Sequence, residues 1–139
     1  MNNDPAAFAI LVALVIIGYH QIRDKIPGFR ERYYASPTWR RRSRWCRRLN
    51  WGRCKTIDCR QAAHVAHHKN YRFFASWTPI EVFDLIPLCR SCHNGLHAVA
   101  KGRLTQAKRK NPYTKYDDVL TSTTEDWISG RIDRKRIAT

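Results

Sequence analysis

Acidic residues are scarce in this sequence of 139 residues. The sequence has only 11 Asp and Glu residues but 26 Lys and Arg residues, so the formal net charge is +15 at pH 7. A globular housekeeping enzyme rarely carries such an excess, whose usual causes are a polyanionic partner or an anionic membrane surface. Charge alone does not choose between these partners, and a basic soluble protein without a specific nucleic-acid function stays a third interpretation.

Internal repeats and low-complexity blocks are also absent, and the length suits one domain with short extensions. Most of the motifs fall within residues 50–100, which is a short stretch for a stable hydrophobic core. Domains below about 50 residues usually need a metal ion or disulfides for stability. The cysteines are therefore the first candidates for a stabilising site.

Positive charge is missing before the one long apolar run, AAFAILVALVII, which spans Ala6 to Ile17 and follows Asp4. A secretory signal peptide carries its positive charge before the apolar region, so that class is excluded. The basic residues after the run favour a membrane helix at residues 6–22 that holds the protein at the cytoplasmic face. About 14 helical residues rise only about 21 Å against a hydrocarbon core of about 30 Å, so a buried or partner-packed helix is the alternative.

Acidic residues are wholly absent between Trp39 and Arg53, where aromatic residues are interleaved with arginines. Ser36 is a candidate helix cap, and Pro37 fits the first turn that follows. We interpret this stretch as an amphipathic basic helix whose arginines face phosphates, with a merely solvated charged face as the alternative. The candidate nucleic-acid contacts are Arg40, Arg41, Arg42, Arg44, Arg47 and Arg48.

Four of the five cysteines form two close pairs, Cys54-x4-Cys59 and Cys89-x2-Cys92. Two such pairs about thirty residues apart fit four thiolates on one zinc ion better than a ladder of disulfides. Reduced structural cysteines or disulfides are the alternatives. Cys46 lies outside both pairs and is predicted to be an ordinary thiol.

The region between the cysteine pairs predicts a strand, a loop, a second strand and a helix. The predicted ranges are 60–68, 69–83, 84–88 and 89–101, with the helix ending near Gly102. The loop holds aromatic residues that either stack on bases or, more commonly, fill a small core. They are Tyr71, Phe73, Phe74 and Trp77.

Four histidines lie at spacings that suit a second metal ion. His67 and His68 are adjacent in the predicted first strand, so their side chains point to opposite faces and one of them can face an ion. His93 and His97 are four residues apart and share one face of the predicted helix. Neutral imidazole is the commonest metal ligand near pH 7. Because Cys92 directly precedes His93, a zinc ion held by the cysteines would also fix the direction of His93.

The strings HVAHHKNY and DLIPLCRSCHNGLH together resemble the zinc-bearing branch of the HNH endonucleases. The upstream stretch YYASPTWRRRSRWCRRLNWGRC looks like the segment that often precedes the first cysteine pair of that family. The resemblance covers residues 33–101, about half of the chain. It implies a small α+β fold with a ββα-metal (His-Me finger) core stapled by a zinc ion on four cysteines, preceded by the basic helix and the N-terminal hydrophobic helix.

The resemblance also implies residue roles. His67 and His93 would bind a catalytic divalent ion (Mg²⁺, Mn²⁺, Ni²⁺ or Zn²⁺), His68 would be the general base, and His97 would join the ion as in colicin-type nucleases. Cys54, Cys59, Cys89 and Cys92 would hold the structural Zn²⁺. Asp84 stands where the family has asparagine, and its carboxylate is expected to accept a hydrogen bond from the base or to reach the ion. The x4 spacing of the first cysteine pair also departs from the usual x2.

We therefore expect a metal-dependent HNH endonuclease that hydrolyses the phosphodiester bonds of DNA. The expected organisation is a hydrophobic helix and linker at 1–30, the nuclease domain at 31–102 and a basic tail at 103–139. Two alternatives stay open at this point: a catalytically inactive zinc-containing module that binds nucleic acid, and a membrane-anchored zinc protein with a role in assembly.

Overall fold

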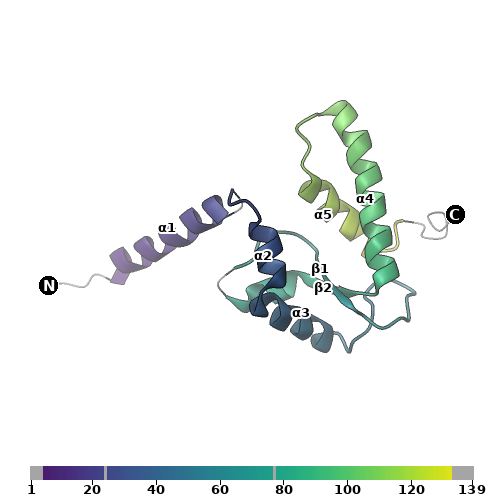
Figure 1. Cartoon of the computed structure of the whole chain (residues 1–139), viewed down its shortest axis with the longest axis horizontal. Helices are drawn as coiled ribbons and strands as arrows, with labels where there is room; N and C mark the ends of the chain where they lie inside the picture. Colours follow the sequence, from purple (N-terminus) through teal and green to yellow (C-terminus); the bar gives the residue numbers. More distant parts are fainter. Residues whose placement is uncertain (1–4, 24, 77, 133–139) are drawn as a thin grey trace. The chain divides into compact units, whose positions relative to one another are not determined.

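The computed structural model describes residues 5–23, 25–76 and 78–132 and shows a small α+β protein (Figure 1). Asp4 and Trp77, which entered the sequence interpretation, lie outside these ranges. The chain divides into two compact units between Thr38 and Trp39. The elements in chain order are α1 (Pro5–Arg23), α2 (Phe29–Ala35), α3 (Pro37–Leu49), β1 (Val65–His68), η1 (Pro79–Asp84), β2 (Leu85–Leu88), α4 (Arg90–Lys110) and α5 (Tyr116–Ile128).

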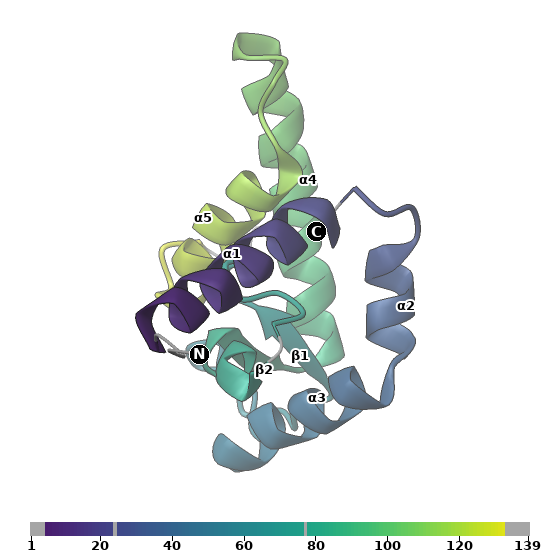
Figure 2. The ribbon, with the colours of Figure 1, turned by 90° about the vertical axis from the view of Figure 1, so that its left-hand side faces the viewer.

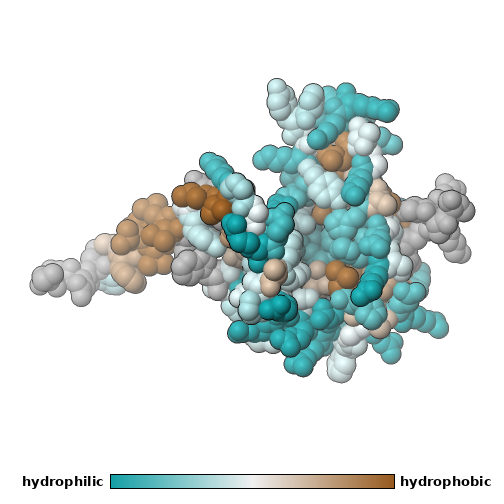
Figure 3. All heavy atoms as spheres, viewed as in Figure 1, coloured by the Kyte–Doolittle hydropathy of each residue, from teal (hydrophilic) through white to brown (hydrophobic). Residues whose placement is uncertain are grey.

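The apolar run forms most of α1, and side chains such as Phe8, Leu11 and Leu14 are exposed along it (Figure 3). Within the described residues, no helix has both the length and the apolar character that crossing a membrane requires. The membrane-spanning helix expected at residues 6–22 is therefore not found. In the sequence, the apolar run ends at Ile17, and the last turns of the helix contain mainly polar residues.

The first unit ends at Thr38 rather than at residue 30, because α2 belongs to it. None of the residues of α2 is fully buried, whereas Phe29 and Tyr33 are half-buried. Gly28, directly before α2, has a φ of 68°, in the left-handed region that favours glycine. Gly28 therefore marks the start of a helix within the first unit and not the start of the second unit.

The second unit is built around an antiparallel hairpin, in which β1 pairs with β2 in the register His67↔Ile86 and His68↔Leu85. All four residues of β2 are buried. Figures 1 and 2 show why: the hairpin lies between α3 on one side and α4 with α5 on the other. Because neighbouring residues of a strand point to opposite faces, this arrangement sends His67 and His68 into different surroundings.

Residues 103–132 are part of this unit and do not form a tail. α4 continues past Gly102 to Lys110, and α5 folds back beside it. Leu120 and Trp127 of α5 are buried against Leu96 and Ala100 of α4. They are seven residues apart, two helical turns, and so lie on one face of α5. The second unit therefore continues past residue 102, where the sequence analysis placed the end of the nuclease domain, because residues of α5 complete its core.

The close packing of α4 on α5 depends on Gly95. A Cβ atom added there would lie 2.8 Å from Cη2 of Trp127, whose Nε1 donates a hydrogen bond to Thr56 Oγ1. Overpacking costs about 1–3 kcal/mol, against a helix-propensity gain of about 1 kcal/mol. Gly95→Ala is therefore expected to lower the free energy of unfolding, measured by urea denaturation of the zinc-loaded protein.

Gly102 provides the matched control, because it lies in the same helix and a Cβ added there meets nothing within 4 Å. Gly102→Ala is expected to raise the free energy of unfolding by about 0.5–1 kcal/mol. Equal effects of the two substitutions would show that Trp127 does not pack against Gly95 as described.

Candidate functional site

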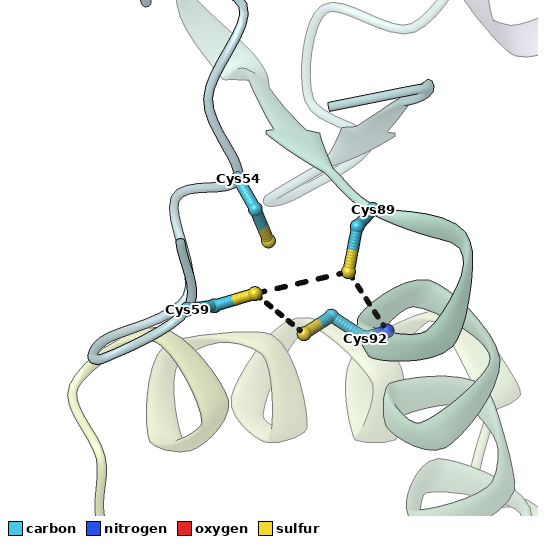
Figure 4. Close-up of side chains that lie close together, drawn as sticks. All are labelled: Cys54, Cys59, Cys89 and Cys92. Atoms are coloured by element: carbon cyan, nitrogen blue, oxygen red, sulfur yellow. Dashed lines mark hydrogen bonds between the residues drawn. The ribbon is translucent and has the colours of Figure 1, made fainter. Parts of the chain in front are cut away.

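Four cysteine side chains converge on one point from two parts of the chain (Figure 4). Cys54 and Cys59 come from the loop before β1, and Cys89 and Cys92 come from the junction of β2 and α4. The Sγ atom of Cys59 lies 3.9 Å from that of Cys89 and 3.7 Å from that of Cys92. Zinc–sulfur bonds of about 2.3 Å in a tetrahedron place sulfurs about 3.8 Å apart. The four residues could therefore hold one metal ion, and the distances are consistent with structural zinc.

Local backbone structure favours the thiolate form of Cys89 in particular, whereas burial raises the pKa of the Cys59 thiol and raises that of Cys92 to about 12. Cys89 is the N-cap of α4, and the backbone N–H of Cys92 donates to its Sγ atom at 3.4 Å. Burial raises the pKa of the Cys89 thiol, but hydrogen bonds from the Ser91 hydroxyl and from this N–H outweigh burial and lower the pKa to about 7. All five cysteines are free thiols. The disulfide alternative is therefore not what the structure shows.

Cys46 lies apart from this cluster, as predicted. It is buried with Ala66 and Leu85, against the ring of Trp39. Burial raises the pKa of its thiol to about 11. Cys46 therefore stays protonated at neutral pH and contributes to packing only.

A second cluster joins His67 of β1 to His93 and His97 of α4, with one ligand nitrogen from each residue within 4.8 Å of the others. The Nε2 atoms of His93 and His97 are 3.1 Å apart. Metal–nitrogen bonds of about 2.0–2.1 Å place neighbouring ligand nitrogens about 3.0–3.4 Å apart. The structure thus brings together the three predicted ligands, including His97 four residues after His93.

The electrostatics of this histidine cluster keep its members neutral. Burial, together with the neighbouring imidazoles, lowers the pKa of His67 to about 3. The same causes lower the pKa of His97 to about 4, and burial lowers the pKa of His93. Neutral imidazoles offer lone pairs to a divalent ion at pH 7 without first losing protons.

Helix α5 supports the histidine cluster, which the sequence did not indicate. Tyr116 OH lies 2.8 Å from Nδ1 of His97, and Thr124 Oγ1 lies 3.0 Å from Nε2 of His67. Such outer contacts fix the orientation of metal-binding rings. No motif in the sequence marks Tyr116 and Thr124 as partners of the histidines. The only indication was that they lie eight residues apart and so share one face of a helix.

We expect Tyr116→Phe to weaken binding of Ni²⁺ or Co²⁺ to the histidine cluster by about 10–100-fold, because it removes only the hydroxyl that holds His97. Isothermal titration of zinc-loaded protein measures this affinity. Tyr113→Phe is the control, since Tyr113 is 89% exposed in the α4–α5 connection. Equal affinities of all three proteins would contradict the role given to Tyr116.

His68 lies on the other face of β1, away from the histidine cluster. It is 2% exposed and stacks between the rings of Trp39 and Tyr71, with centroids 5.2 Å and 5.1 Å away. Its Nε2 atom lies 2.7 Å from Oε1 of Glu81. The structure therefore separates the expected general base from the expected metal ligands.

Glu81 is the residue that the sequence analysis missed most clearly. Its side chain is fully buried, and Oε1 also accepts the backbone N–H of Ala75 at 2.9 Å. Its Oε2 atom pairs with the guanidinium of Arg42, which donates further to the carbonyls of Ser76 and Thr78. A buried carboxylate needs such a partner, because an uncompensated charge in the interior is costly.

Two predicted roles change as a result. Arg42 is 6% exposed, so it is a structural partner of Glu81 and not a contact for phosphates. The Oδ1 atom of Asp84 accepts a hydrogen bond from Asn70 at 3.4 Å rather than one from His68. Its Oδ2 is buried without a hydrogen-bond partner among the described residues. The carboxylate expected beside the histidine base is therefore supplied by Glu81, three residues earlier.

The other predicted arginines stay on the surface of α3. Arg47 is half-buried and donates to Ser43 Oγ, while Arg40, Arg41, Arg44 and Arg48 are exposed. Of the predicted aromatic loop residues, Phe74 is fully buried and Tyr71 is half-buried. These two residues therefore fill the core, whereas the exposed arginines are accessible to a partner.

No family model, curated protein or solved structure matches the chain. Its functional interpretation therefore depends on the geometry of the two clusters, on the charge of the chain and on the sequence motifs.

Proposed function

We propose that the chain is a metal-dependent endonuclease of the HNH type that hydrolyses DNA. The observation that carries the proposal is the histidine cluster, in which His67 of a two-stranded hairpin meets His93 and His97 of the helix that follows. The ββα order around these ligands agrees with the fold that the motifs imply. The net charge of +15 supports a polyanionic substrate.

The two clusters suit different tasks. Four thiolates close the coordination of a zinc ion, which is typical of a structural site. Three imidazoles leave coordination positions open, which is typical of a catalytic site. A divalent ion there would supply Lewis-acid chemistry to the phosphoryl group and favour ionisation of a bound water. The chain's own residues hold the ligands in place, with Tyr116 and Thr124 behind His97 and His67.

The role of His68 as general base has less support than the ligand roles. A base must reach the attacking water directly or through one water molecule. His68 is enclosed by Trp39 and Tyr71, and its Nε2 is engaged by Glu81. We therefore place activation of the nucleophile at the histidine cluster and give His68 a role in the buried network with Glu81 and Arg42.

Plasmid nicking by the full-length protein tests the proposal, with Mg²⁺, Mn²⁺, Ni²⁺ or Zn²⁺ added. We expect at least one ion to support nicking, and His67→Ala or His93→Ala to lower the rate by more than about 100-fold, beyond the usual effect of losing an outer contact. His64→Ala is the matched control, because His64 is exposed and belongs to neither cluster. Circular dichroism verifies that each variant is folded.

The variant His68→Gln distinguishes activation of the nucleophile at the histidine cluster from activation by His68 as general base. A folded His68→Gln protein that nicks within about tenfold of the wild type supports activation at the histidine cluster, whereas a loss as large as that of His67→Ala restores His68 as the base. The nuclease proposal itself fails if the wild type nicks with none of the four ions.

The burial of His68 favours one second candidate, a zinc-containing module that binds DNA without cutting it. The exposed arginines of α3 would serve such a module equally well, because contacts to phosphates require no chemistry. Retardation of DNA in a gel, without nicking under any ion, would establish this alternative.

A further inference from the structure

We propose that the surface at the C-terminal end of α3 binds unpaired nucleotides of single-stranded DNA, with a base stacked on Trp51. This surface, here called the Trp51 surface, consists of Trp51, Arg44, Arg47, Arg48 and Gly52 with Ala63. The inference rests on the proposed function, since it names the form of DNA that the chain would hold.

Trp51 is displayed to solvent in an unusual way. Its side chain is 91% exposed, more than any other large apolar side chain described. Its backbone φ is 56°, in the left-handed region that non-glycine residues rarely adopt. The hydrogen bonds from Gly52 N–H to Arg47 O and from Trp51 N–H to Arg48 O close the end of α3 here. Glycine is the usual residue at such a position.

The chain thus keeps a large exposed aromatic residue where a glycine would fit with less strain. Burial cannot be the reason, because nearly all of the ring is in water. The hydrogen bonds that end α3 account for the left-handed conformation itself. They do not account for an exposed tryptophan at this position, which we attribute to a ligand of the indole ring.

The side chains around Trp51 indicate which chemical groups that ligand would carry. An open surface depression of about 480 Å³ beside the ring is lined by Arg44, Arg47 and Arg48, with Gly52 and Ala63. Among the described residues no acidic side chain lines it, and the sequence of α3 contains none. Arginines bind phosphate groups with directed hydrogen bonds. Figure 3 shows that the surface around α3 is mostly hydrophilic. Trp51 is the most exposed of three large apolar side chains here, ahead of Leu49 and Trp45.

An aromatic platform beside cationic side chains is the arrangement by which proteins hold single strands. A duplex offers its phosphates to arginines but keeps the faces of its bases stacked on one another. The indole ring therefore distinguishes unpaired from paired DNA, whereas the arginines alone would not. An anionic membrane could also attract arginines and tryptophan, so phosphatidylserine vesicles are the competing ligand in the test.

Fluorescence anisotropy of a labelled 20-nucleotide oligothymidylate and of a 20-base-pair duplex tests the inference. Full-length, zinc-loaded protein carrying His67→Ala keeps the strands uncut. In this background, Trp51→Gly is expected to weaken binding of the single strand by about 5–150-fold, the loss of one stacked base. Binding of the duplex should change by less than about twofold. Tyr113→Gly removes another highly exposed aromatic side chain and is expected to change neither affinity.

Thermal unfolding tests whether weaker binding by Trp51→Gly comes merely from a less stable fold. Trp51→Gly should raise the melting temperature, because glycine relieves the left-handed strain, so weaker binding would not come from a weaker fold. Unchanged affinity for the single strand, equal losses for both DNA forms, or binding to phosphatidylserine vesicles without binding to oligothymidylate would each overturn the inference. Plasmid nicking reports separately on the nuclease proposal, which can fail while Trp51-dependent binding holds, or the reverse.

Discussion

Removal of zinc from the cysteine cluster is expected to unfold the second unit. Cys54, Cys89 and Cys92 are part of the main buried core, together with Leu88 and Leu96. The free energy of binding a structural zinc ion is about 10–16 kcal/mol at pH 7, comparable with or larger than the about 5–15 kcal/mol that stabilises a typical domain. Loss of the metal would separate the loop at 54–59 from the start of α4.

Chelation with 1,10-phenanthroline, followed by near- and far-ultraviolet circular dichroism, measures this effect, and a zinc-sensitive dye counts the released ions. Cys59→Ser should prevent retention of zinc at the cluster and leave the unit unfolded at 25 °C. Cys46→Ser is the matched control, because Cys46 is buried in a different cluster and should keep the zinc. Unchanged spectra and unfolding temperature after complete chelation would contradict a structural metal and favour a set of reduced core thiols.

Arg42→Met is expected to destabilise the second unit by about 3–5 kcal/mol, because it leaves the carboxylate of Glu81 buried without its cationic partner. Methionine keeps most of the length of the side chain, so the result reports mainly on the charge and its hydrogen bonds to Ser76 and Thr78. Urea denaturation at pH 7 gives the free energy of unfolding.

Arg41→Met is the control, since Arg41 is the exposed neighbour and its loss should change stability by no more than about 0.5 kcal/mol. Adding Glu81→Gln to Arg42→Met should restore part of the lost stability, because the unpaired charge is then removed. If Arg42→Met weakened DNA binding while leaving stability unchanged, Arg42 would be a phosphate contact after all.

Short-range patterns in the sequence indicated most members of both clusters, and the family resemblance selected His67 over His68. The pair spacings of Cys54 with Cys59 and Cys89 with Cys92 predicted four thiols around one ion, and the structure places their ligand atoms within 4.8 Å of one another. The four-residue spacing of His93 and His97 likewise predicted that they share a helical face. The second strand was predicted to within one residue of Leu85–Leu88. The helical pair and the strand were predictable because each depends on backbone periodicity over a few residues. The four cysteines were predictable because two close pairs are a typical ligand set for zinc.

Tertiary structure alone decided which partners meet across long separations. The pairing of Arg42 with Glu81 joins residues 39 apart, and the contact of His67 with Thr124 joins residues 57 apart. Strand alternation required that His67 and His68 point to opposite faces, but only the packing of α3 and α4 showed which residue faces which helix. From the sequence, Arg42 could not be distinguished from the exposed arginines beside it. Nothing in the local pattern of arginines indicates that its partner is a buried carboxylate 39 residues away. Local sequence thus determined the sets of ligands, and the packing of helices on the hairpin determined the environment and charge around them.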